Sequence, residues 1–105
     1  MTRQRLPNRR PSVTLVQEHE ARSYAVTMGF DPRDGCLREV FTHGAKTGST
    51  MDGILDDVCI ALSLLLQHGV EPRALASSMG RLGDGESPAS IVGVLADLLA
   101  REARP

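Results

Sequence analysis

The sequence predicts an α+β fold: a three-stranded antiparallel sheet, then a long central helix and two further helices packed on one face. Apolar residues alternate with small or polar ones over 23–30, which is the period of a strand. After residue 50 they recur at steps of three and four, which is the period of a helix. The strand-like segments all precede the helix-like ones, and this segregation is typical of α+β domains. The 105 residues suffice for one core and are too few for two.

Three strand-like segments occupy the first half of the chain. The first begins at Ser12, and a short turn at 20–22 leads into the second. A turn over 31–35 follows, because it combines proline, aspartate and glycine. The third segment, 36–43, has apolar residues of both parities, so we expect a bulge near Arg38–Glu39. The apolar face of the second segment consists of Tyr24, Val26, Met28 and Phe30.

Three helices are expected in the second half. The first begins at Ser49 or Thr50 and ends at Gly69, a favourable C′ residue. A short helix follows from Pro72 to about Met79. The last begins with Ser87 as N-cap and Pro88 as its first residue. The apolar stripe of the first helix is broad, which favours a central position, and includes Ile54, Leu55, Val58, Cys59, Leu62, Leu65 and Leu66.

Residues 1–11 form a basic extended arm, and 12–105 form the single domain. The arm holds four of the twelve basic residues and no acid, so eight basic residues face thirteen acidic ones in the remainder. An acidic body is poorly suited to general DNA binding, which depends on many phosphate contacts. Nucleic acid is therefore an unfavoured partner. The arm either binds a partner or stays a solvated terminus. Its candidate partner-binding residues are Arg3, Arg5, Arg9 and Arg10.

The two cysteines, Cys36 and Cys59, lie 23 positions apart and lack zinc-like spacing. We expect no metal and no cofactor, and we read Cys59 as a buried apolar residue, with a redox pair left open. No apolar segment approaches the roughly 20 residues that span a bilayer, and no apolar stretch of a secretory signal follows the basic start. A cytoplasmic protein with no membrane contact is expected. Two open sheet edges and the apolar first helix favour a homodimer.

Two places invite a functional interpretation. The entry to the first helix offers Lys46, Gly48, Ser49 and Thr50 as an anion- or nucleotide-binding site, since helix N-termini attract negative charge. The alternative there is an ordinary capped helix. Glu39 is either a general base or half of a cross-strand ion pair. No catalytic constellation is recognisable, so no catalytic residue is assigned.

Four strings in order carry a family resemblance: LPNRRPS at 6–12, DGCLREVF at 34–41, AKTGST at 45–50 and ALSLLLQHGVEP at 61–72. Their succession resembles the TSCPD domain, the C-terminal module of vitamin-B12-dependent (class II) ribonucleotide reductases. The matching positions to which the resemblance gives no role are Asp34, Gly35, Glu39, Phe41, Gln67 and Gly69.

The resemblance implies a fold module associated with deoxynucleotide metabolism. The reductase barrel, its radical-site cysteines and its cobalamin site have no counterpart in 105 residues, so catalysis does not carry over. We expect a free-standing accessory or regulatory domain that binds a nucleotide-like anion or a partner protein, with a reductase large chain as a candidate partner. The alternatives are a small subunit that completes a ribonucleoside-diphosphate reductase in trans, and a nucleic-acid accessory protein that uses the arginine arm.

Overall fold

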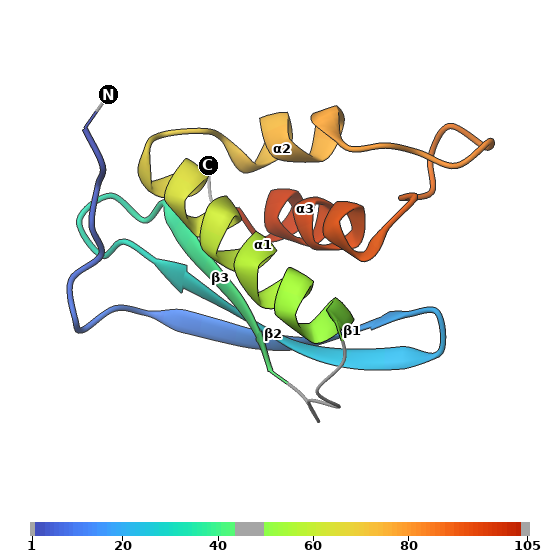
Figure 1. The fold of residues 1–105 in the computed structure, drawn as a ribbon. Helices are drawn as coiled ribbons and strands as arrows, with labels where there is room; N and C mark the ends of the chain where they lie inside the picture. Colours follow the sequence, from blue (N-terminus) through green and yellow to red (C-terminus); the bar gives the residue numbers. More distant parts are fainter. Residues whose placement is uncertain (1, 44–49, 104–105) are drawn as a thin grey trace.

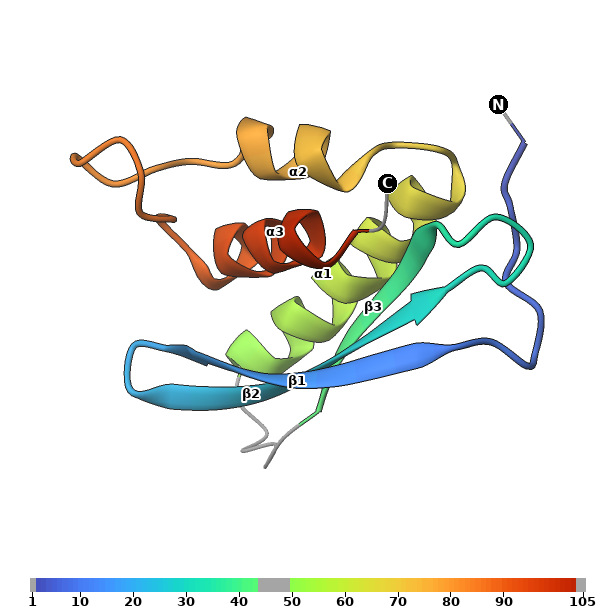
Figure 2. The same ribbon diagram turned by 180° about the vertical axis from the view of Figure 1, so that it is seen from behind.

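The computed structural model describes residues 2–43 and 50–103 and confirms the α+β arrangement (Figure 1). The sheet is antiparallel, with the order β1-β2-β3. Helices α1 and α3 both lie on one side of it, and α2 lies beyond α3 (Figures 1 and 2). The elements are β1 (Ser12–His19), β2 (Arg22–Phe30), β3 (Leu37–His43), α1 (Thr50–Gln67), α2 (Pro72–Ser78) and α3 (Ile91–Glu102).

The core lies between the sheet and the helices. The alternating apolar face of β2 is buried, as its period predicts. From the helical side, α1 contributes Leu55, Leu62 and Leu66, and α3 contributes Leu95 and Leu99. Burial of this apolar surface is the main favourable term holding α1 and α3 on the sheet.

The predicted bulge in β3 is confirmed. Gly29 pairs with Glu39 and Phe30 with Leu37, so Arg38 has no partner on β2. The extra residue turns Leu37 and Val40 to the same side, where they are 4% and 1% exposed. The bulge therefore resolves the mixed parity of apolar residues in this strand.

The expected turn at Gly35 and the expected helix end at Gly69 are also confirmed. Gly35 closes the β2–β3 turn at φ +78°, and the Asp34 carboxylate accepts the Cys36 backbone N–H at 2.9 Å. Gly69 ends α1 at φ +91°, and the Val70 N–H donates to the Leu65 carbonyl at 3.0 Å. The bond from Val70 to Leu65 is part of a Schellman motif, which needs a left-handed residue at the position of Gly69.

The expected start of the last helix is wrong. Helix α3 begins at Ile91, and the Ser90 hydroxyl accepts the Gly93 N–H at 3.2 Å. Ser87 instead donates its hydroxyl to the Asp84 carboxylate, and Pro88 forms a β-bridge with Arg81. The loop uses Ser87 and Pro88 to fold on itself, so the next serine becomes the cap.

Helix α1 is less enclosed than its broad stripe predicts. It packs mainly against β3, while α2 packs mainly against α3. Leu55, Leu62 and Leu66 are buried, but Ile54 and Leu65 are 51% and 42% exposed. One side of α1 therefore faces the core, and the other presents apolar side chains on the surface.

The two-residue turn between β1 and β2 yields the first prediction. Glu20 and Ala21 have φ of +50° and +61°, the left-handed values of a type I′ turn that favours Asn-Gly. Ala21→Gly should therefore raise the free energy of unfolding by about 1 kcal/mol. Urea unfolding measures it. Ala61 is exposed in the middle of α1, so Ala61→Gly is the control. It should lower the free energy of unfolding by about 1 kcal/mol. A loss on Ala21→Gly would contradict the turn geometry.

Candidate functional site

The arginine arm, residues 2–11, lies against the end of the molecule where the β2–β3 turn meets the C-terminus of α1 (Figure 1). The Gln4 N–H donates to the Gln67 carbonyl at 2.6 Å. At the other end of the arm, the Pro11 carbonyl accepts the Phe30 N–H at 2.9 Å and extends the β1–β2 ladder. The arm has no helix or strand before Ser12, yet both of its ends are bonded to the body.

Arg10 and Glu39 form the central contact of this end. The guanidinium of Arg10 donates from Nε and Nη2 to the two carboxylate oxygens, each at 2.9 Å, and from Nη1 to the Pro7 carbonyl at 2.8 Å. The Glu39 carboxylate raises the pKa of Arg10. Gly29 lies opposite Glu39, and a Cβ there would collide with the carboxylate. The ion pair of Glu39 is thus with the arm and not with a neighbouring strand.

Gln67 joins three segments. Its side-chain oxygen accepts from Nε of Arg3 at 2.5 Å, and its Nε2 donates to the Arg38 carbonyl at 3.2 Å. The residue is only 6% exposed, so both ends of the amide need partners. The family resemblance gives Gln67 no role, but the structure shows that this residue links the arm, β3 and α1.

A second cluster lies in the β2–β3 turn. Asp31 is 1% exposed, and its carboxylate accepts from the backbone and side chain of Arg33, which lowers its pKa. Arg38 donates to Asp34 at 2.8 Å and lowers the pKa of that carboxyl to about 2. Arg33 also donates to the Arg5 carbonyl at 2.6 Å. The Asp31 carboxylate thereby fixes Arg33, which holds the arm at Arg5.

The structure brings together five of the residues singled out in the sequence. Arg3 contacts Gln67 and Arg10 contacts Glu39. Arg38, next to Glu39 in the chain, bonds Gln67 through its carbonyl and Asp34 through its side chain. Sequence reasoning missed Asp31, Arg33 and Arg38. The signal for them is the alternation of charge around the turn, DPRDGCLRE at 31–39. The partner of each charged side chain could not be assigned from the sequence, because the bulge decides how Arg38 is oriented.

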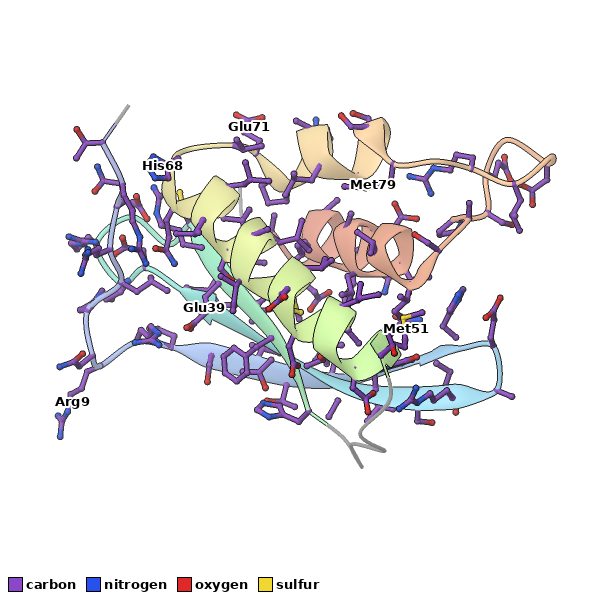
Figure 3. The ribbon with its side chains drawn as sticks, in the orientation of Figure 1. Arg9, Glu39, Met51, His68, Glu71 and Met79 are labelled. Atoms are coloured by element: carbon purple, nitrogen blue, oxygen red, sulfur yellow. The ribbon has the colours of Figure 1, made fainter. Side chains whose placement is uncertain are left out.

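Other candidates lie apart. Phe41 is outside the network and packs edge-on against His43, with ring centroids 4.8 Å apart. Arg5 and Arg9 are exposed, and their side chains make no ion pair within residues 2–43 and 50–103. Figure 3 shows Arg9 pointing away from the body. Lys46, Gly48 and Ser49 fall outside the described residues, and Thr50 is the first residue of α1, so the anion site stays a prediction.

One of the two sheet edges expected to be open is covered. The Ser63 hydroxyl of α1 accepts the Val40 N–H at 3.0 Å and donates to the Val40 carbonyl at 3.1 Å. One turn away on each side, Gln67 bonds the Arg38 carbonyl and Cys59 hydrogen-bonds Thr42. Burial raises the pKa of the Cys59 thiol, which fits the apolar role expected for it. The free side of β3 is therefore hydrogen-bonded to a helix.

Neither a metal-ligand cluster nor a membrane-spanning helix occurs in the part of the chain that the structure describes. There, no three His, Cys, Asp or Glu side chains gather as ligands for a metal ion. Among the same residues, none of the helices combines the length and apolar character needed to cross a bilayer.

The chain belongs to the TSCPD domain family, whose model matches residues 2–103. It is 41% identical over 68 residues to the vitamin B12-dependent ribonucleotide reductases of Streptantibioticus cattleyicolor and Streptomyces clavuligerus. It is 40% identical over 68 residues to that of Rhodopirellula baltica. Each match covers 65% of this chain but only 11%, 7% and 6% of the three relatives. No solved structure matches significantly. The protein is thus a ribonucleotide-reductase-related TSCPD domain.

The neighbouring arginines of the arm provide a matched test of the network. Arg10→Ala removes a bidentate, largely buried contact and leaves Glu39 unpaired, so it should lower the free energy of unfolding by about 2 kcal/mol. Arg9→Ala removes an exposed side chain and should change it by less than about 0.5 kcal/mol. Chemical denaturation of both variants is the measurement. Equal effects of the two substitutions would show that the arm is not docked through Arg10.

Proposed function

We propose that this TSCPD domain is an accessory or regulatory domain of deoxynucleotide metabolism that binds a vitamin B12-dependent ribonucleotide reductase through its docked arm. The observation that carries the proposal is the state of the arm. Its backbone is tied to the body, while Arg5 and Arg9 remain exposed on it. A preformed, extended segment with outward arginines loses little conformational entropy on binding, which favours recognition of a protein surface.

The arm is better suited to a protein than to a nucleotide-like anion. Arg10 and Arg33 already donate to the carboxylates of Glu39 and Asp31, so their positive charge is largely compensated. A phosphate would compete with these carboxylates for the same N–H groups. Arg5 and Arg9 supply charge at the rim of a contact, where charged pairs chiefly affect specificity and association rate.

The family supports the choice of partner in this proposal. The chain covers a small share of each reductase it resembles, so the activity of those enzymes is proposed here only as the process that the domain serves. An acidic patch on the reductase, complementary to Arg5 and Arg9, is the surface that this proposal requires.

Calorimetric titration of the chain into the reductase from the same organism tests the proposal. The double variant Arg5→Glu/Arg9→Glu should weaken binding about tenfold or more, and high salt should weaken the wild-type complex. Arg73→Glu, at an exposed arginine on α2, is the control and should bind like the wild type.

Two outcomes would overturn the proposal: no binding by the wild-type chain, or equal binding by the Arg5/Arg9 variant. Turnover assays with the same samples separate the roles. The chain alone should form no deoxynucleotide. A change in reductase turnover on its addition supports an accessory role, whereas a reductase inactive without the chain would identify a completing subunit instead.

A further inference from the structure

Helix α1 presents an apolar side to solvent. Among the described residues, eight large hydrophobic side chains are exposed, and five of them are on this one helix. A helix packed on one face of a monomer normally turns polar residues outward, whereas a helix that is apolar all round is usually enclosed. Figure 1 shows α1 in the foreground with no element of the chain in front of it. The five residues are Met51, Ile54, Ile60, Leu64 and Leu65.

A groove of about 450 Å³ runs between this side of α1 and β3. Its apolar walls include Phe41, Ile60 and Leu64, which are 37%, 60% and 38% exposed. Its base includes Ser63, whose hydroxyl is already bonded to both outward backbone groups of Val40. A β-strand could not pair with β3 at Val40, because Ser63 already occupies both backbone groups there. The groove therefore suits the side chains of a helix better than a strand.

Charge is ordered along the groove. Asp56 lines it one helical turn before Ile60, and Arg3 lines it beside Gln67, beyond Leu64. The Nε of Arg3 donates to the side-chain oxygen of Gln67. The two terminal nitrogens of Arg3 make no hydrogen bond within the described part of the chain. Glu39 also lines the groove, but Arg10 holds both of its carboxylate oxygens. From Asp56 to Arg3, the order along the groove is thus acid, apolar, apolar, base. An antiparallel copy of the same surface places base opposite acid and apolar opposite apolar.

We infer that the groove is a homodimer interface in which α1 packs antiparallel to α1 of a second copy about a two-fold axis. A two-fold interface must be self-complementary, and this charge order meets that condition. Ile60 and Leu64 of each chain fill the groove of the other, and Asp56 faces Arg3 of the second copy. This inference goes beyond the proposed function, because the dimer forms without a reductase and uses neither Arg5 nor Arg9.

Light scattering coupled to gel filtration, at roughly 10–200 μM chain, tests the interface. The wild type should show twice the 11.3 kDa chain mass. Ile60→Glu and Leu64→Glu, each alone, should give the monomer mass, since burying an unpaired carboxylate in an apolar contact is costly. Leu82→Glu is the control: this leucine is 54% exposed in the loop before α3, and its variant should remain dimeric. Circular dichroism checks that each variant is folded.

A charge exchange tests the orientation. Asp56→Arg and Arg3→Asp should each weaken the dimer about tenfold, and the double variant should recover most of the loss, because both contacts are restored with reversed sign. A wild type that stays at 11.3 kDa over the whole range, or Ile60 and Leu64 variants that remain dimeric, would overturn the inference. So would a double variant weaker than both single ones. Reductase binding by the wild type would be unaffected by any of these results.

Discussion

The free side of β3 is the constraint on which the rest of this fold depends. A three-stranded sheet exposes the backbone groups of its outer strands, which is costly if they are buried and hazardous if they are open. Here Cys59, Ser63 and Gln67, spaced one helical turn apart on α1, hydrogen-bond β3 at Thr42, Val40 and Arg38. This contact fixes the rotation of α1, so Ile54, on the opposite side of the helix, must face outward.

The arm depends on the same contact. Gln67 bonds β3 with one end of its amide and Arg3 with the other, while its carbonyl receives the Gln4 N–H. The bulge at Arg38 places Glu39 where Arg10 reaches it and leaves Arg38 beside the turn carboxylates. One helix end thus organises the bulge, the turn and the arm.

Local patterns predict the elements because local physics decides them: the alternation from Tyr24 to Phe30 and the glycine at Gly69 each specify one conformation. The sequence does not specify the N-cap of α3, because Ser87 and Ser90 are both acceptable caps and the loop contacts of Ser87 decide between them. The contacts of the candidate site are harder to predict from the sequence than the helices and strands. Ser63 and Gln67 look like polar interruptions of an apolar helix, and Arg10 lies 29 positions from Glu39, so their partners follow only from the strand register.

Amide hydrogen exchange at two valines tests the covered edge most directly. Because the Phe30 N–H bonds to Pro11, alternation along the ladder turns the Val16 N–H away from β2, onto the open side of β1. The Val40 N–H points away from β2 as well but is bonded to Ser63. The account predicts slow exchange at Val40 and fast exchange at Val16, with Ser63→Ala accelerating Val40 alone. Equally fast exchange at the two amides in the wild type would contradict it.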